Sequence, residues 1–187
     1  MNVAVCDYGA GNVRSVLAAF RRLGTDARST RDPAEVLGAD LAVLPGVGSA
    51  ASAMAGLREA GLDEALRARV DVGRPTLGIC LGLQLALEWS EEDGGVEGLG
   101  LLPGRAVRLR EGRVPRIGWA PVEPSGEAFY FAHSYAAETP AAVARSEGIV
   151  AVAEAGSFLG VQFHPEKSGP AGAGFLEACL ERCLSPA

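Results

Sequence analysis

The stretch PTLGICLGLQ, residues 75–84, joins one short apolar run to another through a cysteine that lies between two glycines. The first run has the length and composition of a buried strand, and the second run has those of a helix. Cys80 would lie at the turn between them, where Gly78 and Gly82 leave room for a crowded backbone. The stretch therefore predicts a thiol at a sharp strand-to-helix turn.

The first half of the chain repeats this pattern of a short apolar run followed by a helical segment. We expect strands at residues 2–6, 25–30, 40–46 and 75–80, and helices at residues 12–23, 33–38, 51–72 with a break near Gly61, and 81–90. Short buried strands that alternate with helices are typical of a parallel sheet with helices on both faces. In such sheets, functional loops gather at the carboxyl ends of the strands.

The sequence changes in character after Glu91, where a polar, glycine-rich segment predicts a loop. Short strands between proline and glycine turns follow at residues 105–110, 128–135, 141–146, 149–155 and 157–163, and residues 172–184 form a final helix. We expect these strands to form an antiparallel extension of the same sheet. The prediction is one flavodoxin-like α/β domain, residues 1–187, with a mostly parallel central sheet.

The composition argues against several classes of partner. A net charge of −6 disfavours binding to nucleic acid or to an acidic membrane surface. No apolar run approaches the roughly 18 residues of a membrane span, and the N-terminal stretch lacks the basic region of a signal peptide. Four cysteines form no disulfide framework, and with two histidines we expect no metal site. These features predict a cytoplasmic protein without a cofactor.

Cys80 has the setting of a nucleophile. The glycines around it match the G-x-S-x-G turn of hydrolases, with cysteine in place of serine. The helix that follows begins with free N–H groups, and the N–H of Leu81 is the first donor available to an oxyanion. By itself, a cysteine between glycines is more often a small buried residue, so the prediction depends on its companions.

A thiolate needs a base, and the chain has two histidines, His133 and His164. His164 follows an apolar strand, and Glu166, two residues further on, can orient its imidazole. Cys80, His164 and Glu166 make a complete catalytic triad in composition. We therefore expect these three side chains to meet, and we interpret His133 as structural.

The loop PGVGSA, residues 45–50, also follows a buried strand. Its glycines allow backbone N–H groups to turn outward, as they do in an anion-binding nest. Val47 or Gly48 is then a second donor to the oxyanion. Alone, the same sequence is more typical of a tight turn between a strand and a helix.

These motifs carry a family resemblance over nearly the whole chain. GICLGLQ, PGVGS and FHPEKS resemble the triad (class I) glutamine amidotransferases. DYGAGNVRSV at the N-terminus, RVPRIGWA (113–120), YFAHSY (130–135) and GVQFHPEKS (160–168) resemble the glutaminase subunits of imidazole glycerol phosphate synthase, which serve histidine biosynthesis. The resemblance implies a glutaminase that releases ammonia through a thioester on Cys80, with His164 as acid and base.

The resemblance also implies further site residues. Those expected to contact glutamine are Gly46, Gln84, Glu92, Ser134 and Tyr135. The expected partner is a cyclase subunit with a (β/α)8 barrel, which would use the ammonia, and the residues that match interface positions are Asn12, Trp119, Tyr130 and Lys167. Arg116 and Ala120 depart from the histidine and asparagine expected of the family, and both flank the expected interface.

Three other interpretations are compatible with parts of the sequence. The glutaminase of pyridoxal phosphate synthase is similar in size and triad, but it lacks the lysine after HPE that this chain has as Lys167. A cysteine peptidase or hydrolase on a flavodoxin-like sheet would need an open groove and no obligate partner. A binding module would keep Cys80 as a packed side chain without reactivity.

Overall fold

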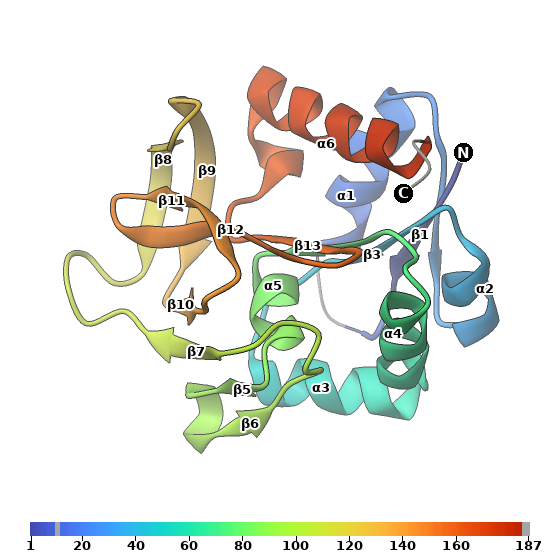
Figure 1. The fold of residues 1–187 in the computed structure, drawn as a ribbon, viewed down its shortest axis with the longest axis horizontal. Coiled ribbons are helices and arrows are strands. Elements are labelled where there is room, and N and C mark those ends of the chain that lie inside the picture. The colour runs from blue at the N-terminus through green and yellow to red at the C-terminus, as the bar shows by residue number, and fades with distance from the viewer. Residues whose placement is uncertain (10–11, 185–187) are drawn as a thin grey trace.

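The computed structural model describes residues 1–9 and 12–184 as one α/β domain around a central sheet (Figure 1). The sheet has seven strands in the order β11-β12-β13-β4-β3-β1-β2. Their bounds are β1 Asn2–Cys6, β2 Asp26–Thr30, β3 Leu41–Leu44, β4 Thr76–Ile79, β11 Ala142–Ser146, β12 Ile149–Ala155 and β13 Phe158–Val161. Strands β2, β1, β3, β4 and β13 are parallel, which confirms the predicted fold class.

Helices cover both faces of the sheet (Figure 1). Helices α1 (Val13–Arg22) and α6 (Gly169–Leu184) lie on one face, and α3 (Ala50–Glu59), α4 (Leu62–Asp71) and α5 (Leu81–Ala86) lie on the other. The short α2 (Pro33–Gly38) packs against β1 and α4. The expected break near Gly61 is present between α3 and α4, where Gly61 has φ 66°. No helix of the described residues is long and apolar enough to cross a membrane.

The last strand, β13, lies in the middle of the sheet. It runs parallel to β4, with Val161 opposite Ile79, and antiparallel to β12. The prediction of a uniformly antiparallel extension is therefore wrong for this strand, and only β12 and β11 extend the sheet in that way. Because β4 and β13 point in the same direction, the residues that follow them emerge at the same edge of the sheet.

The remaining strands form two smaller sheets, which the sequence did not predict. One has four strands in the order β10-β7-β5-β6, and the other is the hairpin β8-β9. Their bounds are β5 Trp89–Ser90, β6 Val96–Glu97, β7 Arg105–Arg108, β8 Arg116–Val122, β9 Glu127–His133 and β10 Tyr135–Glu138. Residues 105–110 and 128–135 are thus strands as expected, but not strands of the central sheet.

Helix α5 ends at Ala86, although the sequence predicted a helix as far as Ser90. The backbone N–H of Leu99 donates to the carbonyl of Leu85, and the N–H groups of Leu101 and Leu102 both donate to the carbonyl of Ala86. These tertiary hydrogen bonds satisfy carbonyls that would otherwise need a further helical turn. The polar segment after Glu91 contains a short 3-10 helix, η1 (Glu92–Gly94), together with β6.

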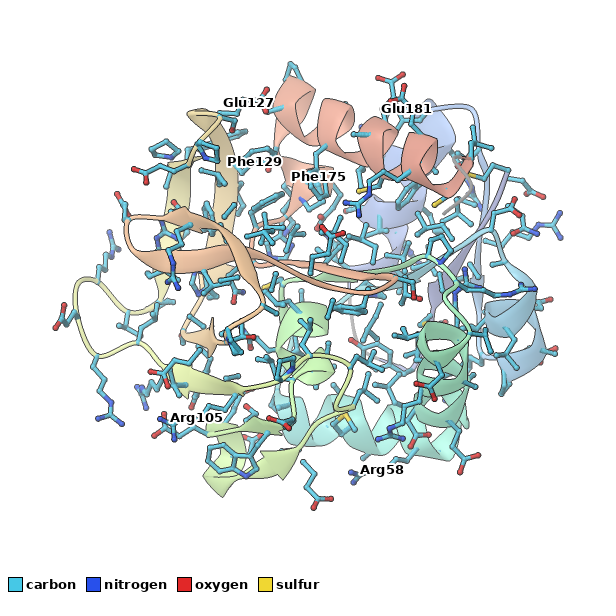
Figure 2. The ribbon with its side chains drawn as sticks, in the orientation of Figure 1. Arg58, Arg105, Glu127, Phe129, Phe175 and Glu181 are labelled. Atoms are coloured by element: carbon cyan, nitrogen blue, oxygen red, sulfur yellow. The ribbon has the colours of Figure 1, made fainter. Side chains whose placement is uncertain are left out.

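An aromatic cluster fixes the β8–β9 hairpin beneath α6. The rings of Phe129 and Phe163 are stacked with centroids 4.1 Å apart, and Phe175 of α6 meets Phe129 edge-on at 6.3 Å. Figure 2 shows Phe129 on β9 and Phe175 on α6 turned toward the same interior region. This packing holds β9 beside the end of β13, so that residues 130–135 approach the carboxyl edge of the sheet.

Candidate functional site

Cys80 lies between β4 and α5 in a strained backbone conformation, with φ 53° and ψ −107°. A non-glycine residue with positive φ costs roughly 1–3 kcal/mol and persists only where its surroundings hold it. Its N–H donates to Val161 of β13 at 2.7 Å, and its carbonyl accepts from the N–H of Leu83 at 3.1 Å. The sharp strand-to-helix turn expected from the sequence is present.

The glycines around the cysteine are needed for close packing. A Cβ on Gly78 would lie 2.7 Å from Phe158 Cζ and 2.9 Å from the carbonyl carbon of Gly82. A Cβ on Gly82 would overlap the carbonyl oxygen of Leu44, at the end of β3. The turn is therefore pressed against the neighbouring strands, and larger residues would displace it.

The three expected triad residues meet. His164 is 2% exposed and follows β13, and its Nδ1 lies 2.9 Å from Oε1 of Glu166 in the 3-10 helix η2 (Pro165–Lys167). Cys80 lies close enough to the imidazole to raise its pKa, and since Nδ1 faces Glu166, Nε2 is the nitrogen left to face the sulfur. The arrangement can supply a nucleophile, a base and a carboxylate that orients the base.

The triad surroundings favour a protonated His164. Burial lowers the pKa of the imidazole, but hydrogen bonds and charge interactions with Cys80 and Glu166 outweigh burial and raise the pKa from 6.5 to about 9. An imidazolium next to a sulfur stabilises the thiolate and can give a proton to a leaving group. The Glu166 carboxylate is buried, and its Oε1 also accepts from the Asn12 amide at 3.4 Å.

A pocket of about 240 Å³ opens above the cysteine. The residues that line it are Val47, Gly48, Cys80, Leu81, Gln84, Glu92, Pro115, Ile117, Ala132, His133, Ser134 and Tyr135. They come from β4–α5, the loop after β3, η1 and the hairpin β8–β9, which all end near the same edge of the sheet. The volume suits a small ligand the size of one amino acid.

The loop after β3 faces the cysteine turn. Val47 and Gly48 line the pocket beside Leu81, and Gly48 has φ 101°. Gly46 is not among the lining residues: it is buried under the turn, where a Cβ would lie 2.6 Å from the N of Gly82. Leu81 begins α5, and the first N–H groups of a helix have no intrahelical acceptor. Oxyanion donors from both loops remain a prediction that this placement supports.

The other residues expected to contact substrate line the pocket. Glu92 accepts from the N–H of Ala50 at 2.9 Å, and burial raises the pKa of its carboxyl group. Gln84 donates to the carbonyl of Tyr135 at 2.8 Å, so its amide is already held in place. Ser134 and Tyr135 follow β9 directly. The pocket lining therefore includes the carboxylate residue Glu92 and the polar residues Gln84, Ser134 and Tyr135.

His133 lines the pocket but lies outside the triad. Burial lowers the pKa of this imidazole to about 4, so it is neutral at physiological pH. Its Nδ1 is 2.9 Å from the carbonyl of Tyr135, and that nitrogen must donate because a carbonyl only accepts. This contact agrees with the structural role that we expected.

The expected interface residues lie on the hairpin β8–β9 and around Glu166. Trp119 is 58% exposed on β8, and its ring meets Tyr130 of β9 edge-on at 6.2 Å. Lys167 is exposed, with Nζ 6.0 Å from the centre of the Tyr130 ring. Asn12 is half-buried and reaches Glu166. Ala10 and Gly11 of the expected N-terminal loop lie outside the described residues.

Comparison with known proteins identifies the family. The family model for class-I glutamine amidotransferases matches residues 4–183. The chain belongs to the class-I glutamine amidotransferase family. Within this family it is 46% identical over 195 aligned positions to the imidazole glycerol phosphate synthase subunit HisH of Methanothermobacter thermautotrophicus, covering 96% of this chain and 98% of the relative. A HisH subunit of Thermus thermophilus is 42% identical, covering 94% and 95% of the two chains.

Solved structures support the amidotransferase fold. A crystal structure of a glutamine amidotransferase has a TM-score of 0.80 at 23% identity, covering 98% of this chain and 99% of that one. A putative subunit of GMP synthase from Thermoplasma acidophilum has a TM-score of 0.73 at 20% identity, covering 98% and 94%. At these identities the likeness concerns the fold alone.

Sequence reasoning missed several polar residues around the amidotransferase triad. Gln162 is fully buried and donates to Cys80 Sγ at 3.6 Å. Ser168 accepts from the N–H of Tyr130 and donates to the carbonyl of His164 at 2.6 Å, while Tyr8 donates to the carbonyl of Pro45. The one signal available was a polar side chain inside an apolar run, as in GVQF. Residues 1–9 and 12–184 contain no cluster of metal-binding side chains.

Proposed function

We propose that this chain is the glutaminase subunit of an imidazole glycerol phosphate synthase, which hydrolyses glutamine to glutamate and ammonia for histidine biosynthesis. The observation that carries the proposal is the contact of Cys80, His164 and Glu166 beside a pocket of about 240 Å³. The names of relatives 42–46% identical support the pathway. The cytoplasm is the proposed compartment, as expected from the sequence.

The first half of the reaction forms a thioester. The Cys80 thiolate attacks the side-chain amide carbon of glutamine, a C–S bond forms, and the carbonyl oxygen becomes an oxyanion. The N–H of Leu81 and an N–H at Val47 or Gly48 stabilise this oxyanion. His164 gives its proton to the amide nitrogen, and the C–N bond breaks to release ammonia.

The second half regenerates the enzyme. His164, now neutral, takes a proton from water as the water oxygen attacks the thioester carbon. The C–S bond breaks, and glutamate leaves with Cys80 again a thiolate beside an imidazolium. Glu166 holds the ring so that Nε2 faces the sulfur throughout.

The pocket residues suit glutamine as substrate. We assign the α-ammonium group to the carboxylate of Glu92, which lines the pocket and accepts from the N-terminus of α3. Ser134 and Tyr135 would contact the α-carboxylate end, and Gln84 would lie beneath the substrate. Gly46 would act from under the turn, by letting the two loops approach each other.

The pocket mouth suits a partner protein. Free ammonia becomes mostly ammonium at neutral pH, which is not a nucleophile, so its use requires a covered passage. Val47 and Ile117 line the pocket and are 39% and 58% exposed, and Trp119, two residues further along β8, is also 58% exposed. We propose that a cyclase subunit with a (β/α)8 barrel docks here, and the contact residues would be Asn12, Trp119, Tyr130 and Lys167.

A substitution of the nucleophile tests the division of labour. In the complex with the cyclase, Cys80→Ser should abolish glutamine-dependent synthesis and leave ammonia-dependent synthesis intact. The isolated chain should be a weak glutaminase that the partner activates. Loss of both syntheses in a folded complex would contradict the assignment.

A glutamine-mimicking electrophile separates this proposal from its rivals. Labelling with 6-diazo-5-oxonorleucine should modify Cys80, as mapped by peptide mass spectrometry. Absence of the adduct, with and without the partner, would favour a binding module. Binding and activation by a pyridoxal phosphate synthase subunit instead of the cyclase would favour the related glutaminase.

A further inference from the structure

A buried chain of hydrogen bonds leads from the cysteine to the backbone of the pocket wall. Gln162 is 0% exposed, and its Nε2 lies 3.6 Å from Cys80 Sγ. Its Oε1 accepts from Gln84 Nε2 at 3.1 Å, and the same Nε2 of Gln84 donates to the carbonyl of Tyr135 at 2.8 Å. The mechanism above gives Gln162 no part.

The backbone carbonyl of Tyr135 fixes the orientation of both amides. A carbonyl only accepts, so the end of Gln84 that faces it is the NH2 group. That NH2 group uses its second hydrogen on Gln162, so the end of Gln162 that faces Gln84 is the oxygen. The NH2 group of Gln162 is therefore the end directed at Cys80, and the sulfur must accept the hydrogen bond.

The remaining contacts of the sulfur agree with that direction. A thiol could donate to the carbonyl of Ala132 at 3.9 Å or to His164. Gln162 can only donate to the sulfur, and an N–H donor binds a charged sulfur more strongly than a neutral one. The bond thus stabilises the thiolate relative to the thiol and relative to the acylated sulfur, which is a weak acceptor.

We propose that Gln162 is a catalytic residue that stabilises the Cys80 thiolate by direct N–H donation, and that Gln84 is a positioning residue that keeps the donor end toward the sulfur. The inference rests on the proposed glutaminase function and deepens it. This role explains why the Gln162 carboxamide is buried between the end of β13 and His164, where an unpaired amide would be costly. It also gives Gln84 a second role besides its place in the substrate pocket.

The test compares the pH dependence of sulfur reactivity in full-length variants. Gln162→Met keeps the approximate volume and removes the donor, while Gln162→Glu replaces the donor by an acceptor. The rate of Cys80 alkylation by iodoacetamide is measured from pH 5 to 10, with the modified residue mapped by mass spectrometry. In Gln162→Met we expect the midpoint to rise by about one pH unit and the rate at pH 6 to fall about tenfold, with the same plateau at high pH. Gln162→Glu should shift further.

Two more variants separate catalysis from packing. Gln84→Met leaves the Gln162 amide free to rotate and should raise the alkylation midpoint of Cys80 by a smaller amount. This variant tests the proposal even if Gln162→Met fails to fold. Ser146→Ala is the matched control, because Ser146 is also 0% exposed and loses its hydrogen bond with Arg116 rather than one to Cys80. Its alkylation midpoint should equal that of the wild type.

The outcomes distinguish this inference from the proposed function. Folded Gln162 and Gln84 variants could keep the wild-type midpoint of Cys80 alkylation within about 0.2 pH unit. If wild-type Cys80 also reacts with the glutamine mimic, this result overturns the role of Gln162 and leaves the glutaminase assignment intact. If the wild-type protein forms no adduct with the mimic and shows no glutaminase activity with the partner, the function itself fails. An upward shift in the kcat/KM–pH profile of glutamine hydrolysis, parallel to the alkylation shift, supports the role.

Discussion

Gly82 lies at the point where α5 meets the end of β3, two residues after the proposed nucleophile. In Gly82→Ala, the new Cβ would overlap the carbonyl oxygen of Leu44 and lie 3.0 Å from its carbonyl carbon. Both obstructing atoms are backbone, so neither can rotate away as a side-chain tip would. The start of α5 must therefore move away from β3.

The size of this effect follows from the contact. Relief requires a displacement of about 1 Å, and overpacking of this kind costs about 1–3 kcal/mol. For a domain of this size each kcal/mol lowers Tm by about 2–4 °C. A displacement of about 1 Å in a catalytic group lowers the rate on the order of 100-fold. We expect a folded protein with Tm lower by about 2–12 °C and glutamine-dependent activity lower by about two orders of magnitude.

Gly174→Ala provides the control. Gly174 lies in α6, and its added Cβ would meet nothing within 4 Å. Because alanine favours a helix over glycine by about 1 kcal/mol, this variant should be as stable as the wild type or slightly more so. Thermal unfolding and glutaminase assays with the partner measure both variants. If Gly82→Ala matches Gly174→Ala in Tm and keeps activity within twofold of the wild type, the steric reasoning is refuted.

Three further predictions concern stability, pH and binding. Arg69→Met should lower the free energy of unfolding by about 4 kcal/mol in urea titrations, because the fully buried guanidinium donates to carbonyls of α2 and of the segments before β3 and β4. Arg58 is exposed (Figure 2), so Arg58→Met should change the free energy of unfolding by less than about 0.5 kcal/mol, and equal effects of the two substitutions would contradict the account. The pKa of His164 is raised from 6.5 to about 9 despite burial. The protonated imidazole therefore adds up to about 3 kcal/mol to the free energy of unfolding, in full below pH 6.5, and this contribution is lost as the pH rises through about 9. Urea titrations of His164→Asn should lack that decline with pH, and an unchanged decline would contradict this account. Trp119→Ala should weaken cyclase binding by about 30-fold in calorimetry, with Tm unchanged within about 2 °C. Val72 lies just after α4 and is 70% exposed, and Val72→Ala should bind the cyclase normally. An equal loss of binding in both variants would contradict the proposed docking surface.

The sequence predicted those parts of the fold that depend on local patterns. The alternation of strands and helices up to residue 80 follows from apolar periodicity, and the turn at Cys80 follows from its flanking glycines. The place of β13 between β4 and β12 could not be read in this way, because strand pairing depends on contacts far apart in the sequence. The early end of α5 has the same origin, since residues 99–102 bind its last carbonyls.

The candidate triad could be proposed from the sequence because cysteine and histidine are rare in the chain, with four and two copies. The supporting polar network was not. Gln162 and Ser168 act through partners that the sequence places far away, Gln84 and Tyr130. A buried glutamine in an apolar run signals that a partner exists, but only the folded chain says which one it is.

The central place of β13 has a consequence for synthesis on the ribosome. In the completed sheet, β13 alone joins the group β1 to β4 to the pair β11 and β12, and it is the last strand to be translated. Residues 158–161 supply the joining ladder, and His164 emerges immediately afterwards. A nascent chain can therefore bring Cys80 and His164 together only after this last strand has been made, because the joining ladder and the histidine both come late in the chain.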